Sequence, residues 1–350
     1  MLCNAAYKPS RFLQNGVRMT IYSALWGKKY WEKTSNSPDL PYKEHIFRGF
    51  QDVPLYGLVA IPENPRGTII ATYGITGDLE SEWSLRILSR KAYDRGYAVI
   101  LFDWRAHGKS AELSPTLTSD GLFEGDDFVC IAAGAAAIGC PAKFWFVGYS
   151  LGGQLALWGN KAATELKKQT TDIGIQSDDI GGVAAVCPNL DSRRSLAYLV
   201  SYPFGRLIEA RIAKNLEKLA WKIHKAHPGS LDPEAIKRAR SIWGFDHELV
   251  IGPLGFPSVE SYYDASNALQ LLPNILKPTL IIYAEDDPFF LPNIVDELRT
   301  ACSGNSAIDL LLTKHGGHIG YINSKKGQQQ ANDPDPWWVW NRIIEWVEMQ

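Results

Sequence analysis

The chain has 350 residues and a formal net charge of −2, with 45% hydrophobic and 21% charged residues. This balance is ordinary for a globular protein with a sizeable core, and it gives no sign of binding to nucleic acid or to an acidic substrate. Five widely spaced cysteines form no Cys-x-x-Cys pair, and neither a signal peptide nor a bilayer-spanning stretch is evident. We therefore expect reduced thiols and a cytoplasmic location.

The first third of the chain opens with two different patterns. Residues 1–42 show no regular periodicity and are rich in aromatic side chains, so we expect an irregular segment that packs on the core. Segments 44–50 and 54–62 alternate roughly between apolar and polar residues on either side of a polar kink. This alternation predicts an antiparallel pair of strands.

From residue 67 onward, short apolar runs alternate with helical patterns. The runs cover 67–74, 98–104, 142–148, 181–188, 278–285 and 308–314. The helical patterns cover 81–95, 122–138 and 151–168. Runs that are apolar throughout are typical of strands buried on both faces of a parallel sheet, and their alternation with helices predicts a doubly wound α/β sheet.

One long interval, 189–276, interrupts this alternation because it holds helical patterns and no clear strand. We expect it to be a helical cap inserted into an α/β core formed by 43–188 and 277–350. Its most regular helix, 206–227, places six apolar residues on one stripe and carries six Lys or Arg residues against two Glu. Such a helix can bind an anionic lipid surface, but we favour a cap helix with a solvated outer face.

The segment Gly148-Tyr149-Ser150-Leu151-Gly152 matches the pattern G-x-S-x-G and lies between an apolar run and a helical pattern. A serine on a sharp strand-to-helix turn needs glycine two residues before and after it, because larger side chains would collide with neighbouring elements. Its hydroxyl is then exposed at a helix N-terminus, where the amide of Leu151 points toward a developing oxyanion. We interpret Ser150 as a nucleophile rather than as part of a structural glycine turn.

A nucleophilic serine needs a base, and the order expected for this turn is serine, then acid, then histidine. The segment KHGGHIGY (314–321) follows the last apolar run and places His318 among glycines, with His315 as its competitor. Two adjacent acids, Asp286 and Asp287, follow the preceding run. Both cannot face one imidazole, and we prefer Asp287 because it stands directly before the proline of the turn.

The second amide of an oxyanion hole should come from the loop after the first buried run, TYGITGD (72–78), and Ile75 is our candidate. A glycine turn without a catalytic role is the alternative interpretation of this loop. The His-x-x-His spacing of His315 and His318 would suit a metal, but no third ligand is evident. We therefore predict neither a metal nor a cofactor.

Together these residues resemble the α/β-hydrolase superfamily and, more closely, its YheT-like branch, whose members are predicted esterases. The segments that carry the likeness are FLQNGVRMTIY (12–22), YGITG, DWRAHGKS (103–110), GYSLGG, residues 244–268, AEDDPF, HGGHIGY and PWWVWNRIIEWV. They are spread over most of the chain. The chain departs from the pattern at Tyr73, Ala106 and Val17-Arg18, where the branch has His, Gly and His-Leu.

The resemblance implies an α/β-hydrolase fold, with a mostly parallel, eight-stranded sheet flanked by helices and a helical cap before the strand that carries the acid. It implies a Ser150–Asp287–His318 triad that cleaves carboxylic esters of acyl or lipid-like substrates through an acyl-enzyme. Two alternatives stay open, an acyltransferase with the same triad and a non-catalytic binding scaffold on the same fold. We expect a small-molecule ester as the partner, with no nucleic acid and no favoured membrane contact.

The apolar stripe of the expected cap must be buried against another surface. The nearest such surface is the active edge of the sheet, so we expect an enclosed, largely apolar pocket. Phe204, Leu207 and Trp243 are candidates for lining it.

Overall fold

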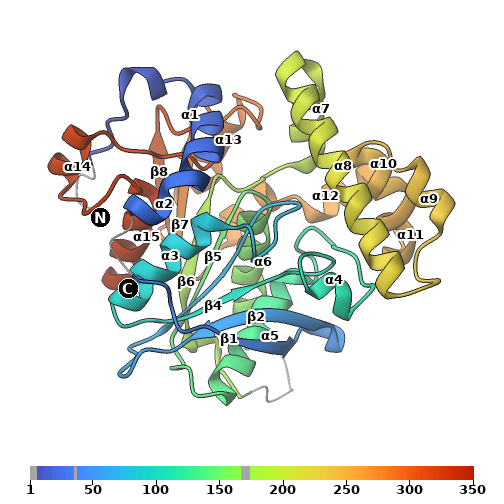
Figure 1. The fold of residues 1–350 in the computed structure, drawn as a ribbon, viewed down its shortest axis with the longest axis horizontal. Helices are drawn as coiled ribbons and strands as arrows, with labels where there is room; N and C mark the ends of the chain where they lie inside the picture. The colour runs from blue at the N-terminus through green and yellow to red at the C-terminus, as the bar shows by residue number, and fades with distance from the viewer. Residues whose placement is uncertain (1–5, 35–37, 167–173) are drawn as a thin grey trace.

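The structure is a computed structural model that describes residues 6–34, 38–166 and 174–350. Figure 1 shows a central sheet flanked by helices, with a second group of helices standing to one side of it. The strands are β1 (Lys43–Arg48), β2 (Pro54–Ala60), β3 (Thr68–Thr72), β4 (Ala98–Phe102), β5 (Phe144–Tyr149), β6 (Ile180–Val186), β7 (Thr279–Ala284) and β8 (Ile308–Thr313).

These strands form one eight-stranded sheet in the order β1-β2-β4-β3-β5-β6-β7-β8. The pairs β1–β2 and β2–β4 are antiparallel, and the remaining pairs are parallel. The prediction of a mostly parallel sheet opened by an antiparallel pair is thus confirmed. Every residue of β3, β4, β5, β6 and β7 is buried, as expected for strands that are covered on both faces.

Besides the N-terminal helices, the α-helices outside the group at the side are α3 (Trp83–Asp94), α4 (Ser110–Leu113), α5 (Glu124–Ala137), α6 (Leu151–Glu165), α13 (Ile294–Cys302), α14 (Lys325–Ala331) and α15 (Trp338–Met349). Among them, α3 packs on α15, and α5 packs on α6. The helix predicted over 151–168 corresponds to α6, and the last two predicted positions lie outside the described residues.

The N-terminal segment is helical where the sequence analysis expected irregular structure, and that prediction was wrong. Helix α1 (Gly16–Tyr22) runs through a π-helical turn (Ser23–Gly27) into α2 (Lys28–Thr34). The buried positions along the segment are Gly16, Met19, Ser23 and Gly27. Their spacing is helical, but three of the four are small, so the segment lacks the apolar periodicity that reveals a helix in a sequence.

Between β6 and β7 the described chain forms helices and no strand. They are α7 (Ser192–Ser201), α8 (Pro203–Ala226), α9 (Pro233–Arg238), α10 (Ile242–Phe245), α11 (Ile251–Leu254) and α12 (Val259–Ser266). Figure 1 shows them beyond the carboxyl ends of the strands, in yellow and orange. Their shared core includes Leu216, Ile223, Ile236 and Tyr262, and it extends to Leu117 from the segment after β4.

Two further observations concern the whole of the described chain. No helix in it is both long and apolar enough to cross a membrane. Its cysteines, Cys130, Cys140, Cys187 and Cys302, are free thiols, and Cys3 lies outside the described residues.

Candidate active site

Ser150 occupies a strained turn between β5 and α6. Its backbone dihedrals are φ 54° and ψ −128°, a combination that is rare for a residue with a side chain. A Cβ atom on Gly148 would lie 1.9 Å from the carbonyl oxygen of Gly152. A Cβ atom on Gly152 would lie 2.3 Å from the carbonyl oxygen of Tyr73. Both glycines are therefore required for the turn that presents the serine.

Three side chains form a continuous hydrogen-bonded chain at the carboxyl end of the sheet. The Nε2 atom of His318 lies 2.9 Å from Oγ of Ser150, and Nδ1 of His318 lies 2.8 Å from Oδ2 of Asp287. The side chains of His318 and Asp287 are only 7% and 1% exposed. When Nδ1 carries the proton, the imidazole donates to the carboxylate of Asp287 and Nε2 accepts from the Ser150 hydroxyl.

Asp286 and His315, the competing residues of the sequence analysis, contact each other instead. Oδ1 of Asp286 accepts a hydrogen bond from the Gly317 amide at 2.8 Å, and Oδ2 lies 3.4 Å from Nδ1 of His315. Burial raises the pKa of Asp286 above its usual value. Asp286 thus connects the loop after β7 to the loop after β8, and it lies outside the chain of bonds that includes Ser150.

The loop of His318 is also held by α1, which the sequence analysis did not assign to the site. The backbone N–H of His318 donates to Oγ1 of Thr20 at 2.8 Å, and the Thr20 hydroxyl donates to the carbonyl oxygen of Gly16 at 2.8 Å. A Cβ atom on Gly16 would lie 1.7 Å from the carbonyl oxygen of Asp286. Helix α1 therefore touches both the acid loop and the histidine loop.

No local pattern identifies Thr20 or Gly16 as residues of the site. The segment that contains them, 12–22, is marked in the sequence only by its resemblance to the family. The contact also depends on Gly317, where a Cβ atom would lie 2.4 Å from the Gly16 carbonyl oxygen. A glycine in each of two segments that are 301 positions apart (317 − 16) is the one signal that could have suggested their close approach.

Two aromatic rings enclose the imidazole of His318. The ring of Phe289 stacks on it with centroids 4.0 Å apart and planes 13° apart. The ring of Phe290 meets it edge-on at 5.3 Å and 74°. These rings restrict the orientation of the imidazole and cover it from water.

The two amides predicted for an oxyanion hole come from elements on either side of Ser150. Leu151 is the first residue of α6, a position whose N–H has no acceptor within the helix. The loop after β3 passes directly against the serine, since a Cβ atom on Gly74 would lie 2.9 Å from Cβ of Ser150. Ile75 follows and lines the same pocket as Ser150 and Leu151.

A buried histidine holds the loop after β3 in place. The amide of Thr76 donates to Nε2 of His107 at 3.1 Å, and Nδ1 of His107 lies 3.0 Å from the carbonyl oxygen of Arg105. The ring of His107 also stacks on Trp104, with centroids 3.5 Å apart. Burial lowers the pKa of His107 to about 4, so the ring is neutral near pH 7 and Nε2 can accept.

Tyr73, a departure from the family pattern, joins this support. Its hydroxyl donates to Oδ1 of Asp103, which also accepts from the Leu79 amide at 3.0 Å. Oδ2 of Asp103 accepts from the Lys109 amide at 2.8 Å. Burial raises the pKa of Asp103 to about 6. A tyrosine at this position therefore ties the strand end to the loop after β4.

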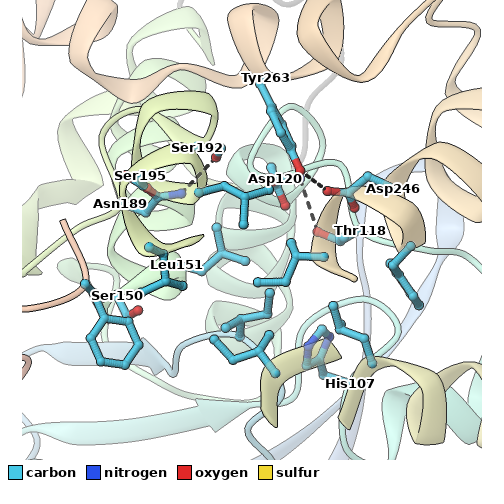
Figure 2. A pocket seen from close by; sticks show the side chains of 18 of the residues that line it. His107, Thr118, Asp120, Ser150, Leu151, Asn189, Ser192, Ser195, Asp246 and Tyr263 are labelled. Atoms are coloured by element: carbon cyan, nitrogen blue, oxygen red, sulfur yellow. Dashed lines mark hydrogen bonds between the residues drawn. The ribbon is translucent and has the colours of Figure 1, made fainter. Parts of the chain in front are cut away.

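A pocket of about 870 Å³, part of it open to solvent, extends from Ser150 beneath the helices that follow β6. Most of its lining is apolar and includes Ile75, Leu117, Leu151, Leu196, Leu199, Ile212, Leu216, Leu219, Ile242, Phe245 and Phe289. Figure 2 shows Ser150 at one end of this pocket and a polar group, Thr118, Asp246 and Tyr263, at the other. The Tyr263 hydroxyl donates to Oδ2 of Asp246 at 2.5 Å.

The three predicted lining residues have different positions. Phe204 and Leu207 line a second hollow, which includes Ser150, His318 and, from the π-helical turn after α1, Ala24. Trp243 lines a separate hollow that does not include them, so its prediction was wrong. The reason is local: Ile242 and Phe245 of the same short helix face the pocket, and Trp243 points away with 42% of its surface exposed.

No group of three or more His, Cys, Asp or Glu side chains within 6–34, 38–166 and 174–350 could hold a metal ion. The two histidines of the His-x-x-His segment contact different carboxylates, Asp286 and Asp287.

Comparison with known proteins gives consistent results. Residues 74–325 match the model of the family described as "Alpha/beta hydrolase family". The chain is 50% identical over 98% of its length to a Synechocystis protein named "Putative esterase slr0264", of which it covers 95%. It is 29% identical over 98% of its length to "Putative esterase YheT" of Escherichia coli, of which it covers 93%. In fold it is similar to an esterase of Pyrococcus furiosus, with a TM-score of 0.55, 18% identity and coverage of 88% of this chain and 93% of that one.

Proposed function

The chain belongs to the alpha/beta hydrolase family, in its YheT-like branch, and from this premise we propose that it is a serine hydrolase that cleaves carboxylic esters. The observation that carries the proposal is the bonded chain from Ser150 Oγ through the His318 imidazole to the Asp287 carboxylate, with separations of 2.9 and 2.8 Å. These are the contacts that a serine, a base and an orienting acid need in order to act together.

In the proposed reaction, Ser150 Oγ attacks the carbonyl carbon of the ester while Nε2 of His318 takes the hydroxyl proton. The carboxylate of Asp287 holds the imidazole in the productive tautomer and stabilises the imidazolium. The alcohol then leaves with the proton from His318, and the acyl group stays on Ser150. A water molecule, deprotonated by His318, attacks this acyl-enzyme and releases the carboxylic acid.

The amides of Leu151 and Ile75 supply the oxyanion hole in this proposal. The Leu151 amide lies at the N-terminus of α6, where the helix dipole adds to the stabilisation of negative charge. Ile75 belongs to a loop that is held by the Thr76–His107 hydrogen bond. Donors that are fixed before the reaction stabilise the developing charge without the cost of reorganisation.

We assign residues 189–276 as the cap of this enzyme, and the apolar pocket beneath it as the site of the acyl chain. Leu196, Ile212 and Leu216 from the cap helices face the pocket that reaches Ser150. Burial of each acyl methylene in such a pocket contributes roughly 0.8 kcal/mol until the pocket is full. The proposed substrates are therefore esters of apolar, lipid-like acids.

The test is turnover of p-nitrophenyl esters of graded acyl length by the wild type and by Ser150→Ala. The wild type should show kcat/KM rising from acetyl to longer acyl chains before it levels off. Ser150→Ala should lose turnover while keeping the fold, since it removes the nucleophile alone. Turnover by Ser150→Ala at the wild-type rate would refute the assignment, and a strict acetyl preference would refute the lipid-like substrate.

A further inference from the structure

Two segments that border the hollow around Ser150 and His318 expose large apolar side chains. The hollow is lined by Ala24 on one side and by Phe204, Leu207 and Ile208 of α8 on the other. The exposed apolar residues of the two segments are Phe12, Ile21, Leu25, Val200 and Leu207, and we call these five the apolar rim. Figure 1 shows α1 and α7 standing at the same edge of the molecule. Leu207 lines this hollow, Val200 lines the neighbouring hollow of Trp243, and the other three lie on the N-terminal segment that contains Ala24.

The apolar rim has two parts, which we call the N-terminal ridge (Phe12, Ile21 and Leu25) and the second ridge (Val200 and Leu207), and their side chains have similar exposed fractions. Leu25 and Leu207 are each 70% exposed, although the burial of a leucine side chain usually stabilises the folded protein. On the N-terminal ridge, Ile21 and Leu25 are four positions apart, so they lie on the same outer face of the helix. Single exposed apolar residues are common on protein surfaces, but several on the two segments beside one opening indicate an interaction site.

The same two segments are basic, although the whole chain has a net charge of −2. Residues 11–33 carry five Lys or Arg residues against one Glu, and residues 200–218 carry four against two Glu. Nine basic against three acidic residues give these segments a net charge of +6, which leaves −8 for the rest of the chain. Arg18, Lys29 and Arg206 are exposed beside the apolar rim.

We propose that the apolar rim docks the protein on the surface of an anionic lipid membrane, with the mouth of the pocket facing the lipid. The proposal rests on the proposed ester hydrolysis and specifies where its substrate comes from. Apolar side chains enter the boundary between headgroups and acyl chains, while neighbouring Lys and Arg side chains attract anionic headgroups. A lipid ester could then pass from the membrane to Ser150 without crossing water.

The sequence favoured a cap helix over a lipid-binding helix for residues 206–227, and the structure gives new support to the lipid-binding alternative. By itself, α8 buries Leu216 and Ile223 and fits an ordinary cap helix. The new element is the N-terminal helical segment, which brings a second exposed apolar and basic surface beside the same opening. Two ridges separated by a hollow suit a deformable lipid surface better than a rigid protein face.

The experiment is co-sedimentation of the full chain with lipid vesicles. We expect binding to phosphatidylcholine vesicles that contain phosphatidylglycerol, and weaker binding to phosphatidylcholine alone or at high ionic strength. Leu25→Glu should reduce the bound fraction about fivefold or more. The matched control is Leu276→Glu, which changes a leucine of 68% exposure in the segment before β7 and should bind as the wild type does.

A second variant, Lys29→Glu with Arg206→Glu, tests the charge and should also weaken binding to the anionic vesicles. Leu25 and Lys29 are outside the linings of the hollows that reach Ser150, so Leu25→Glu should hydrolyse a soluble short ester at the wild-type rate. The docking proposal is overturned if the wild type does not bind anionic vesicles, if it binds phosphatidylcholine alone equally well, or if Leu25→Glu binds like the wild type.

These outcomes separate the two proposals. A protein that binds the vesicles through the apolar rim but hydrolyses no ester would keep the docking site and refute the proposed function. If the protein hydrolyses soluble esters but does not bind the vesicles, the proposed function stands and the docking site is refuted.

Discussion

The turn of Ser150 and the loop of His318 meet at one site, but different parts of the chain determine their shapes. The turn depends on glycines two positions to either side of the serine and on the strand and helix that it joins. The loop depends on Thr20, which lies 298 residues earlier in the chain. Both halves have tertiary contacts, since the Ser150 amide donates to the Val186 carbonyl oxygen at 2.9 Å, but only the serine half also has a local sequence motif.

The two residues are therefore held in different ways, Ser150 through its backbone and His318 through both its backbone and its side chain. Ser150 is rigid because its backbone starts a helix, and Gly153 and Gln154 donate hydrogen bonds back to its carbonyl oxygen. His318 lies in a glycine-containing loop, and it gains its position from Thr20, from Asp287 and from the stacked ring of Phe289.

The largest effect is expected at the acid. Asp287→Asn removes the charge that orients His318 and stabilises the imidazolium, and kcat should fall by a factor on the order of 10⁴, as it does for the aspartate of the serine protease triad. Asp286→Asn changes the neighbouring acid, which contacts Gly317 and His315 instead. Its kcat should fall far less, and the reverse ranking in steady-state kinetics would show that Asp286 is the orienting acid.

The contact between α1 and the acid loop is tested by Gly16→Ala. The new methyl group would lie 1.7 Å from the carbonyl oxygen of Asp286, so helix and loop must separate. Overpacking of this kind costs roughly 1–3 kcal/mol, and we expect lower kcat together with a lower midpoint of denaturant unfolding. Gly252→Ala is the matched control, because it adds a methyl group to a helix where nothing lies within 4 Å. Equal kcat and equal unfolding midpoints in the two variants would contradict the proposed contact between α1 and the acid loop.

A smaller and more specific effect is expected for Thr20→Val, which keeps the shape of the side chain but removes the acceptor for the His318 N–H. Because the loop loses a partly buried hydrogen bond and small displacements of a catalytic base are expensive, kcat should fall roughly 10- to 100-fold. KM should change little, since Thr20 is outside the pocket linings. Thr20→Ser keeps the hydroxyl and should restore most of the activity; a Thr20→Ser variant as impaired as Thr20→Val would point to packing instead.

The smallest effect is expected at His107, which holds the loop after β3 beside Ser150. It should appear in the pH dependence of the free energy of unfolding. His107 has its pKa lowered to about 4 by burial, from an ordinary value of 6.5. As the pH falls through 6.5, the unfolded chain binds a proton at this residue and the folded protein does not. His107 therefore lowers stability progressively between pH 6.5 and 4. His107→Gln should show a shallower loss of stability over this range, measured by denaturant unfolding, and an unchanged slope would contradict the buried neutral ring.

How much the sequence revealed follows the same division between local and distant determinants. The succession of strands along the chain, the serine turn and the acid and histidine loops all have local patterns, and Asp287 was preferred as the acid because it stands directly before the proline of its turn. The N-terminal helical segment was missed because three of its four buried residues, Gly16, Ser23 and Gly27, are small. Trp243 was assigned to the wrong side of a short helix, because four residues are too few for apolar periodicity to fix a face.

The central claim is that Ser150 is the nucleophile and that His318 activates it. The most direct test is to label the protein with a fluorophosphonate probe, locate the adduct by peptide mass spectrometry, and compare labelling rates of the wild type and His318→Ala. We expect a single adduct on Ser150, and a labelling rate that is orders of magnitude lower in His318→Ala than in the wild type. An adduct on another residue, or equal labelling rates in the two proteins, would contradict it.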